Sequence, residues 1–187
     1  MTDSIFTNNI AEINNGGAIY WSNSADYLIS DCNFTNNTAE INGGVFYSTN
    51  SPRGLITNSN FDSNRALTGS GGVLNWNGPN SNLTNCRFTN NKATDSGVID
   101  ALNPNGRISN CTFINNSVSS GAGAISWGGP NGIVSNCDFI NCSARGSAGA
   151  IYWLNTNKNG TVINCNFINI TGNGEVQFVG ILVMMEK

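Results

Sequence analysis

The sequence predicts an all-β solenoid of about seven coils, with 25 to 28 residues per coil. Three observations lead to this fold class: one phenylalanine recurs at nearly constant spacing, its neighbours recur with it, and no segment shows the period of an amphipathic helix. A unit of this length cannot bury an apolar face alone, so the units must stack. The recurring residues are Phe6, Phe34, Phe61, Phe88, Phe113, Phe139 and Phe167.

The first predicted strand of each coil is centred five residues before the phenylalanine. A branched aliphatic residue occupies that position, as Ile29, Ile56, Leu83, Ile108, Val134 and Val162. A sharp turn follows three residues before the phenylalanine, where asparagine tolerates the left-handed backbone conformation that such a turn needs. Stacked coils would align these side chains in a hydrogen-bonded ladder, built from Asp31, Asn58, Asn85, Asn110, Asn136 and Asn164.

The second predicted strand runs from a cysteine column through the phenylalanine. We expect Cys32, Cys86, Cys111, Cys137 and Cys165 to stack inside the core as buried thiols. A disulfide from Cys86 to Cys111, or from Cys137 to Cys165, is a strained alternative. The sixth cysteine, Cys142, is expected in a turn, where it would be reactive or crosslinked.

A second asparagine ladder is predicted two residues after the phenylalanine. It contains Asn8, Asn36, Asn90, Asn115, Asn141 and Asn169, with Ser63 as the exception. About ten residues after each phenylalanine comes a glycine-led third strand, and strict alternation along it separates an inward column from an outward one. The inward column contains Ile19, Phe46, Leu74, Ile99, Ile125 and Ile151.

The outward column of the glycine-led strand is the candidate ligand-binding stripe. Its members are Tyr20, Tyr47, Asn75, Asp100, Ser126 and Tyr152. Such a polar and aromatic stripe could hold a glycan or a partner protein, although ordinary surface decoration is the simpler reading. The same strands carry Trp21, Trp76, Trp127 and Trp153 on the core side, which favours packing over sugar stacking.

Composition narrows the function classes. Charged residues make up 10% of the chain, the net charge is −3, and the sequence pI is about 4.7, so a nucleic-acid or polybasic membrane role has little support. With no histidine and no CxxC pair, we predict neither a metal site nor a cofactor. The apolar stretch 176–185 is too short to span a bilayer. We expect a repeat domain at 1–171 and a terminal strand, cap or truncated end at 172–187.

Two paired motifs carry a family resemblance. Gly16 to Ile19 reads GGAI, and FxxN begins at Phe6, Phe34, Phe61, Phe88 and Phe113, failing at Phe139 and Phe167. This pairing resembles the chlamydial polymorphic membrane protein repeats, shared with adhesin-like surface proteins of methanogenic archaea. The resemblance implies a right-handed, single-stranded parallel β-helix in an extracellular attachment or stalk region. It also implies flanking repeats of a longer chain, a surface glycan or protein as partner, and no catalytic residues.

An enzyme is the alternative function class. Right-handed β-helices include pectate lyases and other polysaccharide-active enzymes, and this chain could be a truncated or non-catalytic piece of one. Glycoside hydrolysis needs two carboxylates that converge on one cleft. The outward column supplies only Asp100, Asp95 falls in the preceding turn, and Asp62 is expected to pair with Arg87. The sequence therefore predicts no enzyme.

Overall fold

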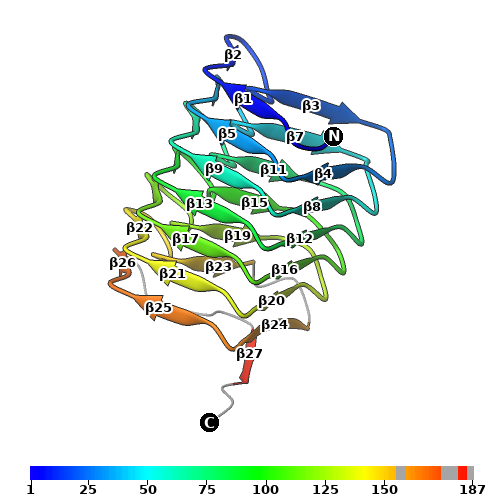
Figure 1. Ribbon diagram of the computed structural model, residues 1–187. Coiled ribbons are helices and arrows are strands. Elements are labelled where there is room, and N and C mark those ends of the chain that lie inside the picture. The colour runs from blue at the N-terminus through cyan, green and yellow to red at the C-terminus, as the bar shows by residue number, and fades with distance from the viewer. Residues whose placement is uncertain (155–158, 174–180, 185–187) are drawn as a thin grey trace.

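The computed structural model describes residues 1–154, 159–173 and 181–184, and this part of the chain contains strands and turns without helix. The strands form four parallel sheets that run along a rod (Figure 1). The Phe sheet contains β1 (Ile5–Thr7), β5 (Asn33–Thr35), β9 (Asn60–Asp62), β13 (Arg87–Thr89), β17 (Thr112–Ile114), β21 (Asp138–Ile140) and β25 (Asn166–Ile168). The short sheet contains β2 (Ile10–Ala11), β6 (Thr38–Ala39), β10 (Arg65–Ala66), β14 (Lys92–Ala93), β18 (Ser117–Val118), β22 (Ser143–Ala144) and β26 (Thr171–Gly172).

Two further sheets complete each coil. The Gly sheet contains β3 (Ile19–Ser22), β7 (Phe46–Thr49), β11 (Leu74–Trp76), β15 (Ile99–Ala101), β19 (Ile125–Trp127) and β23 (Ile151–Trp153). The aliphatic sheet contains β4 (Leu28–Ser30), β8 (Leu55–Thr57), β12 (Asn82–Thr84), β16 (Arg107–Ser109), β20 (Ile133–Ser135), β24 (Gly160–Ile163) and β27 (Ile181–Met184). β27 pairs with β24 inside the segment where the sequence predicts a terminal strand or cap. The boundary at 171 stays a prediction.

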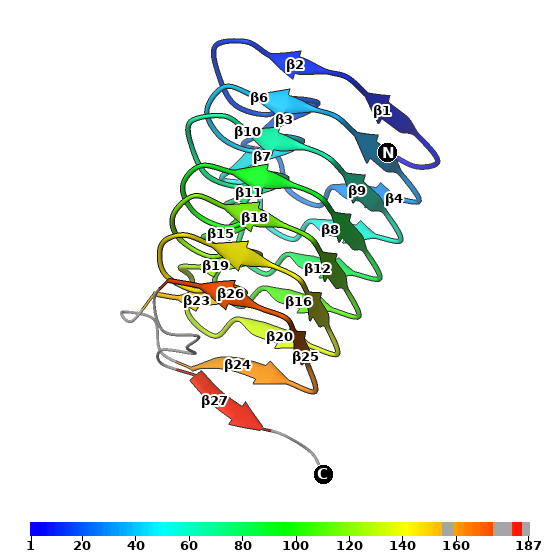
Figure 2. The same ribbon diagram turned by 90° about the vertical axis from the view of Figure 1, so that its left-hand side faces the viewer.

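Every strand pairs with the equivalent strand of the next coil, as the repeat predicts. Phe6 lies opposite Phe34, for example, and Phe88 opposite Phe113. Figure 2 shows the coils stacked one above another. The prediction from the sequence is wrong on one point, because the coils build four sheets and not three. The fourth strand is only two residues long, as in Thr38–Ala39, and two residues are too few to show a period in the sequence.

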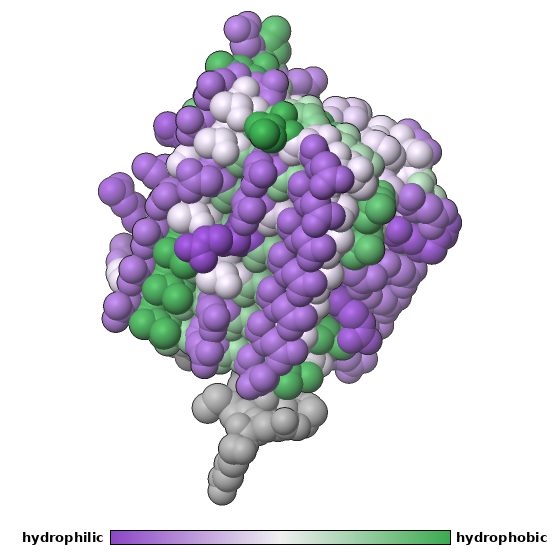
Figure 3. Space-filling view, in the orientation of Figure 1, coloured by the Kyte–Doolittle hydropathy of each residue, from purple (hydrophilic) through white to green (hydrophobic). Residues whose placement is uncertain are grey.

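Both predicted exposed ladders form at the turns of the coil. Asn58, Asn85 and Asn110 have φ angles of 50°, 54° and 53°, and the Nδ2 of each later residue donates to the Oδ1 of the one before at 3.3 Å. In the second ladder Asn141 donates to Asn115 at 3.1 Å, and Asn115 donates to Asn90. Hydrophilic stripes follow the rod axis on the face seen in Figure 3.

A column of stacked rings fills the core behind the Phe sheet. Neighbouring phenylalanine rings from Phe6 to Phe167 have centroids 4.7 to 4.9 Å apart and lie nearly parallel. Phe113 is fully buried between Phe88 and Phe139. The aliphatic columns also face inward as predicted, because Ile56, Leu74 and the other predicted members of their two columns are buried.

A glycine pair precedes β3, β7 and β11, and its two members have separate causes. Gly43 has a φ of +63°, which side-chain-bearing residues rarely adopt. Gly44 meets a different constraint, since a Cβ there would lie 2.1 Å from the carbonyl oxygen of Gly72 and 2.6 Å from backbone atoms of Arg65. The GG motif therefore allows the short sheet and the Gly sheet to approach each other closely.

A third asparagine ladder, which the sequence analysis did not identify, lies inside the core. Its members are the last residues of the FxxN motifs: Asn9, Asn37, Asn64, Asn91 and Asn116. The Oδ1 of Asn64 accepts from the backbone N–H of Asn37 at 2.9 Å and from its Nδ2 at 3.0 Å. The Nδ2 of Asn64 donates to the Oδ1 of Asn91 at 3.1 Å and to the Phe34 carbonyl at 3.0 Å. Asn37, Asn64, Asn91 and Asn116 are each fully buried.

Cys142 occupies the next position of this buried ladder. It is fully buried, and its Sγ lies 3.5 Å from the Phe113 carbonyl, which corresponds to the carbonyl that asparagine binds in the other coils. Cys142 lies in the turn between β21 and β22 as expected, but the prediction that it is reactive or crosslinked is wrong, because it is a buried free thiol. Burial also raises the pKa of Cys142, which disfavours the reactive thiolate.

The position of a phenylalanine within the stack should set its contribution to stability. Phe113→Ala is expected to lower the free energy of unfolding by about 3–5 kcal/mol, because it leaves a cavity between two rings. Phe167→Ala should cost less, since Phe167 is only partly buried. Denaturant unfolding of both variants measures the difference. Equal losses at the two sites would contradict a stacked core.

Truncation of a buried ladder residue should lower the free energy of unfolding more than truncation of an exposed one. Asn64→Ala removes the partner of two donors on Asn37 and of the Phe34 carbonyl, so we expect a loss of about 2–4 kcal/mol in unfolding free energy. The control is Asn90→Gly, which removes an exposed ladder amide while tolerating the φ of 57°. Its loss should be about 1 kcal/mol or less. A similar loss in both variants would mean that burial of the ladder adds nothing.

Candidate functional site

The structure brings the six residues of the predicted stripe together on the outer face of the Gly sheet. They lie opposite one another on consecutive strands, in the order Tyr20, Tyr47, Asn75, Asp100, Ser126 and Tyr152. Strand alternation alone places them there, because the residues on either side of each one point into the core. Whether they bind a ligand stays a prediction.

The two N-terminal tyrosines of the stripe stack on each other. The ring centroids of Tyr20 and Tyr47 are 5.3 Å apart, with 22° between the planes, so each ring covers one face of the other. Tyr20 is 57% exposed, whereas Tyr47 and Tyr152 are half-buried. Ser126 is only 5% exposed, because larger side chains flank it on both neighbouring strands, and it offers little to a ligand. The stripe is therefore more accessible at its tyrosine pair than at Ser126.

Asp100 is the single acid of the stripe, and its pKa is perturbed. Burial, reinforced by the charge of Asp95, raises its pKa from the ordinary 3.8 to about 6, against the opposing effect of a hydrogen bond from Asn75. The Asn75 Nδ2 donates to Asp100 Oδ2 at 2.9 Å. Asp95 accepts from the hydroxyls of Ser70 at 3.4 Å and Ser120 at 3.1 Å. Asp95 lies in the turn before β15, as the sequence predicts, and its charge acts on Asp100.

The tryptophan column lies in the core, as strand alternation predicts. Trp76, Trp127 and Trp153 are buried, and the last two stack with ring centroids 5.2 Å apart. The Nε1 of Trp76 donates to the hydroxyl of Tyr27 at 2.6 Å, and burial raises the pKa of Tyr27 to about 12. Trp21 is only partly buried. The three buried rings are closed to a sugar ligand.

The predicted cysteine column is also internal. Cys32, Cys86, Cys111 and Cys137 are buried, Cys165 is partly buried, and all six cysteines are free thiols. The Sγ atoms of Cys111, Cys137 and Cys165 each lie 3.2 Å from the carbonyl oxygen two residues earlier in the chain. Hydrogen bonding with Cys137 and Cys86, together with burial, raises the pKa of Cys111 well above its usual range. These thiols act as small core residues.

The acids elsewhere on the surface do not form a second site. The predicted ion pair between Asp62 and Arg87 is wrong, because Arg87 lies opposite Asn60 while Asp62 lies opposite Thr89 and accepts from Ser63 and Asn90. Arg53 and Asp26 form the single ion pair found in the described part of the chain, at 2.7 Å. Across the described residues, no three metal-ligating side chains gather into a metal site. The same residues include no helix long and apolar enough to cross a membrane.

Comparison with known proteins identifies the family. The family model described as "right handed beta helix region" matches residues 1–167. The chain belongs to this family. Comparisons with curated proteins and with solved structures found no match. The family assignment fixes the β-helix as right-handed, and it leaves open the choice between a binding protein and a polysaccharide-active enzyme, because the fold serves both.

The β-helix should lose stability as Asp100 ionises. Its folded-state pKa is raised from 3.8 to about 6, so its contribution to stability is fully present below pH 3.8 and is lost as the pH rises through about 6. Asp100→Asn removes this dependence. Relative to wild type, the variant should gain about 1–3 kcal/mol of unfolding free energy on going from below pH 3.8 to above pH 6. Denaturant unfolding at both pH values tests this, and parallel pH profiles would contradict a raised pKa.

Proposed function

We propose that this β-helix is a non-catalytic attachment or display module of an extracellular, adhesin-like surface protein. The observation that carries the proposal is the stripe itself, in which the stacked pair Tyr20–Tyr47 continues into the hydrogen-bonded pair Asn75–Asp100 on adjacent strands. Parallel strands repeat every 4.8 Å or so, which gives the stripe an even spacing along the rod. A regular, rigid row of polar and aromatic groups suits an extended ligand such as a surface glycan.

The stacking of the tyrosines decides how a glycan would be held. One face of each ring is covered by the other ring, so a sugar can stack only on a remaining face. The phenolic hydroxyl groups can donate and accept hydrogen bonds. Asn75 and Asp100 add an amide and a carboxyl group beside them. Recognition would therefore depend on hydrogen bonds more than on ring stacking.

A polysaccharide-active enzyme is the second candidate, and one observation favours it. Asp95 and Asp100 interact, and the pKa of Asp100 is raised to about 6. An acid with a raised pKa next to an ionised one is the arrangement that glycosidases use for proton transfer. Release of reducing sugar ends from a polysaccharide by the wild type, abolished in Asp95→Asn, would establish the enzyme and overturn the non-catalytic module.

Removal of the three tyrosines should abolish glycan binding while preserving the fold. We expect the triple variant Tyr20→Ser, Tyr47→Ser, Tyr152→Ser to lose binding on a glycan array, since each lost aromatic contact costs about 1 kcal/mol. A matched control replaces three exposed apolar residues of the other sheets: Leu28→Ser, Leu55→Ser and Ile168→Ser. Thermal melting of both variants checks the fold. Unchanged binding by the tyrosine variant would exclude the stripe as the binding surface.

A further inference from the structure

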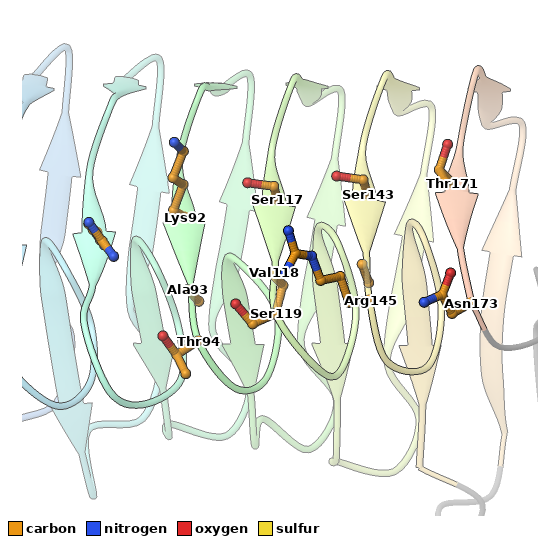
Figure 4. A pocket seen from close by; sticks show the side chains of 12 residues that line it. Lys92, Ala93, Thr94, Ser117, Val118, Ser119, Ser143, Arg145, Thr171 and Asn173 are labelled. Carbon is orange, nitrogen blue, oxygen red and sulfur yellow. The ribbon is translucent and has the colours of Figure 1, made fainter.

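A groove crosses the outer face of the short sheet, away from the tyrosine stripe. It has a volume of about 450 Å³ and is lined by residues from β10 to β26 and from the turns that follow these strands. A second hollow of about 490 Å³ shares Arg65 and Lys92 with it and extends towards Asn90 and Asn115 of the exposed ladder. Figure 4 shows the side chains that line the first groove.

The groove concentrates the positive charge of an acidic protein. Arg65, Lys92 and Arg145 line it, which is three of the eight basic residues in a chain of net charge −3. Its lining contains no aspartate or glutamate. All three cations are exposed, and within the described residues none of them forms an ion pair. Three cations close together without counter-charges favour an anionic ligand.

The remaining lining consists mostly of side chains with hydroxyl groups. Ser117, Ser143 and Thr171 continue the column of Lys92 on the next three strands. In Figure 4 these hydroxyls follow one another along the rod, and the Arg145 side chain extends back towards Val118 of the preceding coil. A ligand that follows this column meets a charged group first and then a regular series of hydrogen-bonding groups.

The spacing of the cations indicates how far apart the anions of the ligand are. Arg65 and Lys92 lie opposite each other on neighbouring strands. Arg145 directly follows β22, which lies two strands beyond the β14 strand of Lys92. At roughly 4.8 Å per strand, the backbone positions of Lys92 and Arg145 are about 10 Å apart along the rod. This interval is close to the length of a disaccharide.

We propose that this groove binds a linear acidic polysaccharide that carries one anionic group on every second sugar. One anion pairs with Arg65 and Lys92, the next pairs with Arg145, and the sugar hydroxyls between them bond to Ser117 and Ser143. The site extends the proposed attachment function to a second face of the rod. It does not require the tyrosine stripe to bind anything.

Other polyanions fit the groove less well. Its lining contains no aromatic residue on which a nucleic-acid base could stack. A duplex presents a much denser row of phosphates than three cations can match, and the net charge of −3 opposes its approach. Asp95 directly follows the groove residue Thr94, so a negative charge borders the groove and repels a densely charged polyanion.

The test uses hyaluronate, an alternating acidic polysaccharide, with chondroitin sulfate as a sulfated counterpart and dextran as a neutral one. We expect the full chain to bind the acidic polymers, more weakly as salt is added, and not to bind dextran. The double variant Arg65→Gln, Lys92→Gln should lose about tenfold in affinity for hyaluronate. The control double variant Arg87→Gln, Arg107→Gln removes the same charge from exposed positions on two other sheets and should bind as the wild type does.

Three results would overturn the proposal that this groove binds an acidic polysaccharide. Equal losses of affinity in the two double variants would mean that only the net charge of the protein matters. Failure to bind either acidic polymer would exclude an acidic polysaccharide as the ligand. Tighter binding to duplex DNA than to hyaluronate at the same salt concentration would indicate that the groove binds nucleic acid and not a polysaccharide. The tyrosine triple variant separates the two proposals, because it should keep its affinity for hyaluronate even if the stripe itself binds nothing.

Discussion

The buried amide ladder is the interaction on which the rest of the rod depends. Each inward asparagine such as Asn64 binds a backbone N–H and the phenylalanine carbonyl of the coil before it, and donates to the ladder amide of the coil after it. An unpaired polar group in this core would cost as much as a hydrogen bond gains, so the coils can stack only in the register that pairs all of them. The phenylalanine column and the sheets keep this register.

The ladder also explains how coils of unequal length stack evenly. Asn37 and Asn64 are separated by 27 residues and Asn91 and Asn116 by 25, yet their Nδ2 to Oδ1 distances are 3.0 and 3.1 Å. One missing residue comes from the connection between the short sheet and the Gly sheet, and the other from the connection between the Gly sheet and the aliphatic sheet. These connections are the places where the chain can change length without disturbing the core.

The sequence predicts the features that recur in every coil, and it fails where a single residue carries the information. Columns such as Phe6 to Phe167 and the turn asparagines follow from spacing and alternation, and the structure confirms them. The two-residue fourth strand has no period of its own. Cys142 shows the same limit, because only its alignment with Asn116 reveals that it replaces a buried amide. The outward direction of the stripe could be predicted, whereas the effect of Asp95 on the pKa of Asp100 and the gathering of Arg65, Lys92 and Arg145 depend on the path of the turns.

The coils of β22 and β26 carry Cys142 and Ile170 in place of the buried ladder asparagine, so the rod should resist a pulling force less at these two coils than at the others. Cys142 keeps the contact with the Phe113 carbonyl but offers Asn116 a sulfur in place of the amide oxygen, which is a weaker acceptor, and Ile170 has no polar side-chain atom at all. In a stack where each coil contacts only its neighbours, the interface with the fewest hydrogen bonds separates first. A pulling force would therefore detach the coils of β22 and β26 first and leave the coils of β6 to β18 closed. In an attachment protein, the coils of β22 and β26 would extend under force first. The coils of β6 to β18, which carry the run of paired amides, would come under load later.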